Sequence, residues 1–238
     1  MRGEGARMRS LVAAFLLVCV LVAGTGVRAA DGPAQTVTGI PLDAPWKATI
    51  YAFAQKNFHH PAWGWQHSER DYRLAVEIAA GDKLAVDTDV LFAAAMLHDM
   101  AAFKPFERPK VEHGDVAAEV SEPILRDAGF PMNKFPLVQA AMRGHMYYSE
   151  ATLPDAIALH DADSVDFLGT IGAVRIIALT GEAKPDVQGA IKTLRSFVTT
   201  IPGRLITKTA ARMGAQRVTE LVALLDQLDR EAYSGKAI

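Results

Sequence analysis

The sequence contains almost no cysteine and no large excess of either charge. Among 238 residues only Cys19 is a cysteine, and it lies in an apolar stretch near the N-terminus. The rest of the chain therefore offers no disulfide and no thiolate, so any metal must be bound by imidazoles and carboxylates. With 25 Lys and Arg against 27 Asp and Glu, we expect no broad basic face and no nucleic acid polymer as partner.

The first 29 residues have the pattern of a signal peptide. Three arginines precede a short apolar run from Leu11 to Gly24, and small residues lead to an expected cleavage after Ala29, with Met8 as an alternative start. The run is too short for a membrane span, and no small residue directly precedes Cys19 as a lipoprotein site requires, so no stable membrane anchor is expected. Four basic residues and one acidic residue would leave with the peptide. The sequence thus predicts a periplasmic or secreted protein with 21 basic and 26 acidic side chains.

Alternating β-branched residues, which are typical of strands, are nearly absent beyond this leader. Apolar residues instead recur at helical spacing between stop signals such as Gly129-Phe130-Pro131. Asp87 is a candidate N-cap, and Pro123 predicts a kink or break inside its segment. After a lead of residues 30–44 we expect one all-α domain over residues 45–238. The expected helices cover residues 45–58, 66–81, 86–101, 111–129, 134–147, 154–168, 169–181, 185–200 and 206–232.

A His-Asp pair closes an apolar helix at Leu97-His98-Asp99-Met100. A buried carboxylate is strongly unfavourable unless it is paired, hydrogen-bonded or bound to a cation. Taken alone, the pair is equally well explained as an internally hydrogen-bonded helix end. Three further histidines stand at ends of other expected helices, however, since His67 and His113 open one each and His145 closes one. The pattern therefore favours a shared polar site.

Acidic residues also interrupt the apolar segment Ala158–Gly169. Asp161, Asp163 and Asp166 are not expected all to face solvent, because successive helical residues turn by about 100°. At least one should point inward. Imidazoles and carboxylates contributed by several helices of a bundle are typical of di-iron or di-manganese sites.

In this order the residues resemble the HD-domain superfamily of metal-dependent hydrolases. The family pattern is a histidine, a His-Asp pair and a distant aspartate, and the matching positions are His67, His98, Asp99 and Asp163. Asp163 is preferred because the family places this ligand in an Ala-Asp-x-Leu/Val segment, here residues 162–165, and Asp161 stays the alternative. The resemblance covers residues 55–180 and implies an HD-type helical bundle.

The number of metal ions has two interpretations. Some members of the superfamily add two histidines between the pair and the last aspartate and hold two ions, and His113 and His145 lie in that interval. The resemblance then implies six ligands, with Asp99 bridging both ions. Alternatively, the two histidines stand beside a single ion or donate to a phosphate. Sets of His and Asp accept Fe, Mn, Zn, Co or Ni.

A phosphorylated substrate would need cationic partners near the ligands. Arg70 follows His67 by three residues and shares its helix face, so it is the first candidate. Many members continue the His-Asp pair with Gly-Lys, whereas this chain has Met100-Ala101-Ala102-Phe103-Lys104, so Lys104 would act from a different turn. Arg175 either reaches back to the site or pairs with an aspartate of the preceding helix.

The resemblance leads to the prediction of a metal-dependent hydrolase of phosphate esters, acting on a small phosphorylated compound or nucleotide. A divalent ion lowers the pKa of bound water and polarises a phosphoryl oxygen. Asp99 would orient the hydroxide, while Arg70 and Lys104 would contact the substrate. Two alternatives remain: an HD-type di-iron oxygenase, whose members have the same ligand order, and a non-catalytic metal- or ligand-binding protein. The partner is a small molecule in the first two cases, and no oligomeric state is specified.

Overall fold

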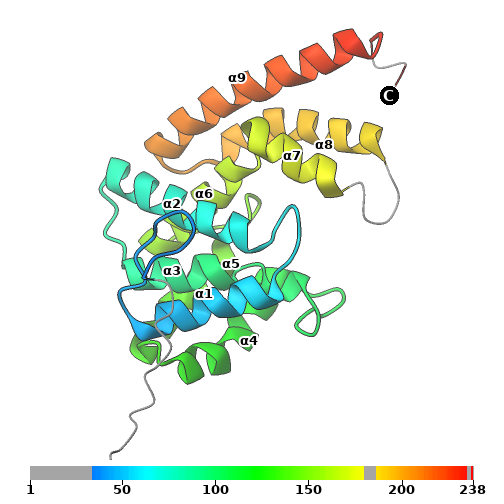
Figure 1. Ribbon diagram of the computed structural model, residues 1–238. Coiled ribbons are helices and arrows are strands. Elements are labelled where there is room, and N and C mark those ends of the chain that lie inside the picture. The colour runs from blue at the N-terminus through cyan, green and yellow to red at the C-terminus, as the bar shows by residue number, and fades with distance from the viewer. Residues whose placement is uncertain (1–33, 180–185, 235–236, 238) are drawn as a thin grey trace, which may run out of the picture. The chain divides into compact units, whose positions relative to one another are not determined.

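The computed structural model describes residues 34–179, 186–234 and 237 (Figure 1). Apart from one isolated bridge between Gln35 and Pro41, these residues form no β-structure. The prediction of an all-α fold is therefore confirmed, whereas the predicted signal peptide lies outside the described residues. The helices are α1 (Pro45–Asn57), α2 (Trp65–Asp82), α3 (Thr88–Leu97), α4 (His113–Ala128), α5 (Phe135–Gly144), α6 (Pro154–Asp166), α7 (Gly169–Leu179), α8 (Val187–Thr200) and α9 (Lys208–Glu231), with the 3-10 helices η1 (Met100–Ala102), η2 (Met132–Lys134) and η3 (Pro202–Arg204).

Local sequence signals explain where α3 and α4 begin and end. Asp87 is the N-cap of α3, as expected, and its Oδ1 accepts a hydrogen bond from the backbone N–H of Asp89 at 2.9 Å. α3 ends at Leu97, and the chain then tightens into η1 rather than continuing as a helix to residue 101. α4 contains Pro123 and continues to Ala128 as one helix, so the expected segment is not divided there.

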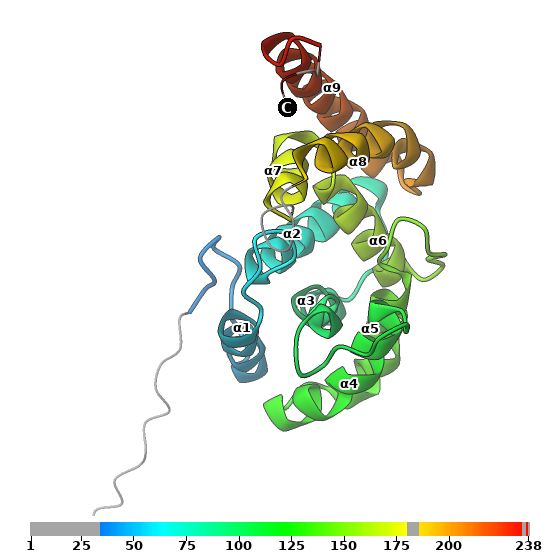
Figure 2. The same cartoon turned by 90° about the vertical axis from the view of Figure 1, so that its right-hand side faces the viewer.

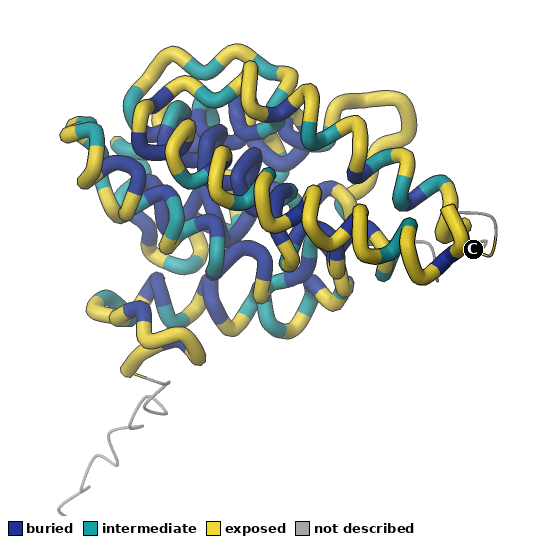
Figure 3. The backbone as a smooth tube through the Cα atoms, turned by 90° about the horizontal axis from the view of Figure 1, so that it is seen from above, coloured by how far each residue is buried: buried dark blue, intermediate teal, exposed yellow. Residues whose placement is uncertain are grey.

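α3 is the central helix of the bundle because its sequence is apolar on every side. Each residue from Val90 to Leu97 is buried, as expected for a helix without a polar face. Figure 2 shows α1, α2, α4, α5 and α6 around α3, and α3 contacts all five. Buried positions gather in the interior of the bundle in Figure 3. The end of α3 therefore delivers His98 and Asp99 to the middle of the protein.

The last three helices form a separate layer, in which α9 packs on α7 and α8 (Figure 1). This layer is joined to the rest through contacts of α9 with α2 and α6. Asp161 of α6 fixes the approach to α9, since its carboxylate accepts the backbone N–H groups of Ile206 at 2.9 Å and Thr207 at 2.7 Å. Across the described helices, none combines the length and the apolar character that a membrane crossing requires.

Candidate metal centre

The six predicted ligands converge at the end of α3. They come from five helices or helix ends: His67 from α2, His98 and Asp99 from the end of α3, His113 from the first residue of α4, His145 from the residue after α5, and Asp163 from α6. Segments far apart in the chain therefore supply side chains to one place. The carboxylate of Asp99 lies between two groups of these residues and divides the site into two halves.

The first half is formed by two histidines and two aspartates. Nε2 of His67 lies 3.3 Å from Oδ1 of Asp163 and 3.5 Å from Oδ2 of Asp99. Nε2 of His98 lies 3.3 Å from the same oxygen of Asp99. Two ligands at right angles around an ion, each about 2.1 Å from it, are roughly 3 Å apart. The spacing of these atoms therefore suits a common ion.

The second half lies on the other oxygen of Asp99. Its Oδ1 is 3.2 Å from Nε2 of His113 and 3.6 Å from Nε2 of His145. The two Nε2 atoms are 3.0 Å from each other. Two imidazole nitrogens that both present lone pairs repel at this distance, so they need a proton or a cation between them. The position of Asp99 between the two halves is that of a bridging ligand.

Each of the four histidines has its other ring nitrogen occupied. Nδ1 of His98 lies 2.9 Å from the carbonyl oxygen of Ala95, and Nδ1 of His145 lies 2.6 Å from that of Met142. A carbonyl only accepts hydrogen bonds, so these Nδ1 atoms must carry the proton. In the neutral ring Nε2 then carries the free electron pair, and this tautomer binds a metal through Nε2.

Carboxylates play the same part for the other two histidines. Asp166 Oδ2 accepts from Nδ1 of His67 at 2.9 Å, and Glu112 Oε1 lies 2.8 Å from Nδ1 of His113. A carboxylate behind a ligating histidine fixes the ring orientation and increases the basicity of the outer nitrogen. All four Nε2 atoms are therefore aimed into the site by their own hydrogen bonds.

Burial and crowding of charge shift the pKa values of the site. Burial lowers the pKa of His98, but the carboxylates of Asp99 and Asp71 outweigh this effect and raise it to about 9. Burial raises the pKa of Asp99, yet His98 and the imidazoles on its other side hold it well below its usual range. The pKa of Asp163 is also lowered, because hydrogen bonding and charge from His67 outweigh burial. Anionic carboxylates therefore face histidines that bind protons strongly when no other cation is present.

Asp161, Asp163 and Asp166 of α6 are all buried and have separate roles. Asp161 holds the start of α9, so the alternative ligand points away from the cluster. Asp163 faces His67 within the cluster. Asp166 accepts from His67, from Arg70 and, at 2.9 Å, from Nη1 of Arg175. A three-residue spacing thus places one ligand and one supporting carboxylate on the same helix.

One further acidic residue, Asp71, was missed by the sequence interpretation. It lies one turn after His67 on α2, is fully buried, and its Oδ2 is 3.1 Å from Nε2 of His67. Burial raises its pKa to about 7. The signal was present, because Ala75 and Ile78 continue the same buried face of α2. A carboxylate at the i, i+4 position of a candidate ligand on an apolar face was the available clue.

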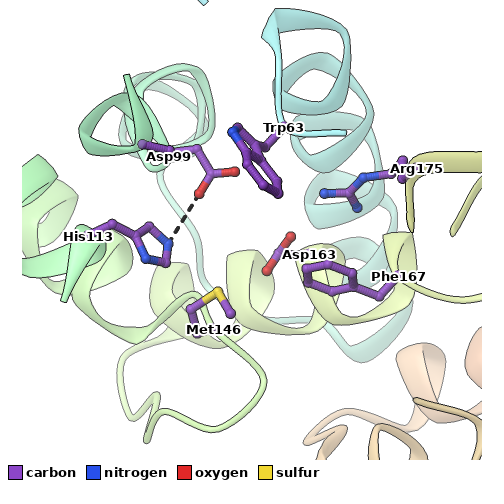
Figure 4. Close-up of a pocket in the computed structure, with 8 residues that line it drawn as sticks. Trp63, Asp99, His113, Met146, Asp163, Phe167 and Arg175 are labelled. Carbon is purple, nitrogen blue, oxygen red and sulfur yellow. Dashed lines mark ion pairs between the residues drawn. The ribbon is translucent and has the colours of Figure 1, made fainter. Parts of the chain in front are cut away.

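A cavity of about 200 Å³ opens onto the centre. Its lining residues are Trp63, Asp99, Ala102, His113, Met146, Asp163, Phe167 and Arg175. Figure 4 shows Asp99, His113 and Asp163 from three different elements facing this space. The indole of Trp63 is held by stacking on His60, with ring centroids 3.8 Å apart. Aromatic and thioether groups thus form much of the wall.

Arg175 is the cation of this wall. Its side chain is buried, its guanidinium lies over the ring of Phe167, and its Nε donates to the carbonyl of Ala62. Its Nη1 pairs with Asp166, while its Nη2 lies 3.1 Å from Nε2 of His67. The salt bridge to an aspartate of the preceding helix, one of the two predicted alternatives, is therefore formed, and it holds the arginine at the cavity.

The two other predicted cations are placed elsewhere. Arg70 donates Nε and Nη2 to Asp166 and lines a second depression, whose other lining residues include His59, His60 and the predicted ligand His67. Lys104 is 86% exposed, and its Nζ lies 3.8 Å from Oε1 of Glu107. Neither is among the residues that line the cavity beside Asp99. Their assignment as substrate contacts stays a prediction.

The donor set fits a divalent ion. Several buried atoms here have no hydrogen-bond partner among the described residues: Nε2 of His98, both oxygens of Asp71 and Oδ2 of Asp163. Buried polar groups normally have hydrogen-bond partners, so a cluster of such atoms needs an explanation, and a bound ion is one. One ligand atom each from His67, Asp71, His98 and Asp163 lies within 4.8 Å of the others. Imidazole and carboxylate together suit Fe, Mn, Zn, Co or Ni.

Comparison with protein families supports the same interpretation. The family model described as HD domain matches residues 64–168, the segment that contains all six predicted ligands. The described residues thus form an all-α bundle of the HD-domain type, and its buried His/Asp cluster suits a divalent metal. The matched segment is less than half of the chain. No curated protein matches the chain.

Solved structures resemble this fold over most of the chain. Bacillus subtilis YpgQ, solved in complex with ADP, is 19% identical with a TM-score of 0.60, and the match covers 78% of this chain and 97% of that one. A predicted HD superfamily hydrolase from an uncultured Thermotogales bacterium is 27% identical with a TM-score of 0.52, covering 76% and 88%. An HD-superfamily hydrolase from Bacillus thuringiensis is 16% identical with a TM-score of 0.57, covering 79% and 95%.

Proposed function

We propose that this protein is a dinuclear metal-dependent hydrolase of phosphate esters. The observation that carries the proposal is the position of Asp99, whose two oxygens face two different pairs of histidines. His67, His98, Asp99 and Asp163 would hold one ion, and Asp99, His113 and His145 would hold the other. A pair of divalent ions supplies an activated water and a clamp for the attacking and leaving oxygens of a displacement at phosphorus.

The protein's own groups orient the water and the substrate. Oδ2 of Asp163 has no hydrogen-bond partner among the described residues, and Asp163 lines the cavity. Its lowered pKa keeps it anionic, so it acts as an acceptor that aligns a water molecule. Burial of the cluster beneath Trp63 and Phe167 limits access of bulk water and strengthens each electrostatic interaction inside.

Arg175 is the group that we propose for binding the phosphate. Its guanidinium is anchored by Asp166 through Nη1, so Nη2 is presented at the cavity wall. This Nη2 faces Nε2 of His67. A metal on Nε2 would take that partner away, and a phosphate oxygen would replace it. An anchored guanidinium loses little freedom on binding an anion.

The cavity supports a compact substrate. Apart from Arg175, its lining residues carry no fixed positive charge, and Trp63, Met146 and Phe167 provide apolar contact. A triphosphate would bring several negative charges to a wall with one arginine. We therefore propose a phosphomonoester whose alcohol portion is apolar or cyclic. The predicted leader supports a periplasmic or secreted setting for this reaction.

The test is phosphate release from a panel of esters by the protein loaded with Mn²⁺, Fe²⁺, Zn²⁺ or Co²⁺. We expect release from small aryl or alkyl monoesters, and a loss of at least about 100-fold in kcat/KM for Asp99→Asn. Arg175→Lys should mainly increase KM, whereas Arg70→Lys should not. No release from any ester, by metal-replete protein, would contradict the proposal.

The apolar cavity wall also favours a second candidate, a di-iron oxygenase that oxidises a C–H bond. Such a reaction requires the same six ligands and an uncharged substrate surface next to them, which Trp63, Met146 and Phe167 would accommodate. The discriminating sign is an oxygen-dependent change in the optical or EPR spectrum of the iron-loaded protein when a substrate is added. Phosphate release without oxygen would exclude this candidate.

A further inference from the structure

Asp71 is a buried carboxylate that the six-ligand scheme leaves without a role. It lies on α2, one turn after His67, with no exposed surface. Neither of its oxygens has a hydrogen-bond partner among the described residues. A buried carboxylate in this state is strongly unfavourable unless a cation accompanies it.

The arginines beside the cluster do not serve as that cation. Arg70 and Arg175 both direct their guanidinium groups to Asp166 instead. What Asp71 faces is the pair of ligand nitrogens: its Oδ2 lies 3.1 Å from Nε2 of His67 and 3.6 Å from Nε2 of His98. These are the same two atoms that face Asp99 and are candidates to bind the first ion.

Hydrogen bonds from neutral histidine rings do not explain this arrangement. Nδ1 of His67 is already directed to Asp166, and Nδ1 of His98 must donate to a carbonyl. Both Nε2 atoms therefore carry lone pairs when the rings are neutral, and lone pairs do not donate to Asp71. A single cation placed among Asp71, His67 and His98 satisfies all three groups.

We infer that Asp71 is a ligand of the first ion, together with His67, His98, Asp99 and Asp163. This inference rests on the proposed metal centre and extends it from six protein ligands to seven. With three carboxylates and two imidazoles, the first position is richer in oxygen than the second. Carboxylate ligands suit Mn²⁺, whereas imidazole suits Zn²⁺, so Asp71 shifts the preference of the first position toward Mn²⁺ or Fe²⁺.

The test compares the full-length chain with Asp71→Asn, which keeps the shape of the side chain but removes its charge. Affinities for Mn²⁺ and Zn²⁺ are measured by competition with a chelator. We expect the Mn²⁺ affinity of the tighter site to fall about 10- to 100-fold, and the Zn²⁺ affinity to fall less. The absorption of bound Co²⁺ should also change, because its coordination number changes.

The melting temperature is a second measurement, and the direction of its change distinguishes a ligand from a purely structural residue. Without metal, at a pH where the rings of His67 and His98 are neutral, Asp71→Asn should melt at a higher temperature than the wild type, because the buried charge of Asp71 then has no cation beside it. With Mn²⁺ its metal-induced increase in melting temperature should be smaller. The matched control is Glu69→Gln on the same helix, a buried carboxylate that instead faces Thr38, and it should leave Mn²⁺ affinity unchanged. Asp71→Ala repeats the test with a second side chain.

The outcomes separate this inference from the function on which it rests. If the wild type binds Mn²⁺ and both Asp71 variants bind it equally well, Asp71 is not a ligand and the proposed hydrolase stands. The same conclusion follows if both variants melt lower without metal and keep the wild-type Co²⁺ spectrum. If the wild type binds no ion at all, the proposed metal centre is contradicted, and so is the assignment of Asp71 as a ligand.

Discussion

Asp99 directs one carboxylate oxygen to His113, with Oδ1 3.2 Å from Nε2. The other oxygen is left for the opposite half of the site, where it faces His67 and His98. An aspartate that only stabilised a helix end would use both oxygens for backbone or solvent contacts. This division of the two oxygens is the basis of the two-ion scheme and of the predictions that follow.

The second ion should be separable from the first. His145→Asn removes a predicted ligand whose Nε2 lies 3.6 Å from Oδ1 of Asp99. We expect metal content to fall from about two ions to about one, and phosphate release to fall at least about 100-fold because one side of the clamp is lost. Elemental analysis of anaerobically purified protein measures the first effect. Equal metal content in the variant and the wild type would place His145 outside the ligand set.

Gly114 affects the half of the site that contains His113 and His145 through its packing and not as a ligand. A Cβ at this position would lie 2.6 Å from the carbonyl oxygen of Met142 and 3.2 Å from Nδ1 of His145. Gly114→Ala should therefore displace His145 and lower occupancy of the second ion. The matched control is Gly203→Ala, because a Cβ there meets no atom within 4 Å. Similar metal content in both variants would contradict this packing role.

Asp166 should act on the metal through His67. It fixes Nδ1 of this ligand and also neutralises Arg70 and Arg175. Asp166→Asn leaves two guanidinium groups without their charge partner, so the free energy of unfolding should fall by about 3–5 kcal/mol. Affinity for the first ion should fall about 10- to 100-fold. Denaturant unfolding and chelator competition measure the two effects. Unchanged affinity for the first ion would show that Asp166 does not position His67.

Stability of the metal-free protein should decrease as the pH rises from 6.5 to 9. The folded-state pKa of His98 is about 9 against an ordinary 6.5, and that of Asp71 is about 7 against 3.8. Both groups bind protons more tightly in the folded chain, so their contribution is present at low pH and is lost as each proton leaves.

Stabilisation by bound metal should instead increase with pH, because the metal ligands must be deprotonated. The metal-induced increase in melting temperature should therefore grow over the same pH range. Calorimetry with and without Mn²⁺ provides the comparison. A melting temperature of the metal-free protein that rises from pH 6.5 to 9 would contradict the assigned pKa directions.

The fold was largely predictable because its signals are local. Helix after helix follows apolar periodicity and a stop signal, and the Asp87 cap is readable from the chain. Histidines at helix ends and aspartates that interrupt an apolar segment predicted a shared polar site, and the resemblance to the HD-domain superfamily supplied its six members. Tertiary packing then brings them together around the end of α3.

The remainder of the site depended on contacts that sequence spacing does not reveal. Asp161 and Asp163 are two residues apart and equally acidic, yet only the position of α9 lets Asp161 accept hydrogen bonds from the backbone of the two residues before that helix. Arg70 shares a face with His67, as predicted, but Asp166 attracts its guanidinium. Asp71 became recognisable as a member of the cluster only when its burial and lack of partners were known.

The most direct test is the number of metal ions bound per chain. The protein, expressed with its predicted leader and purified without oxygen, is analysed for bound elements. The account predicts close to two ions, mainly manganese or iron. One ion would contradict the bridging role of Asp99 between two positions, and none, after exposure to each candidate ion, would contradict the metal centre itself.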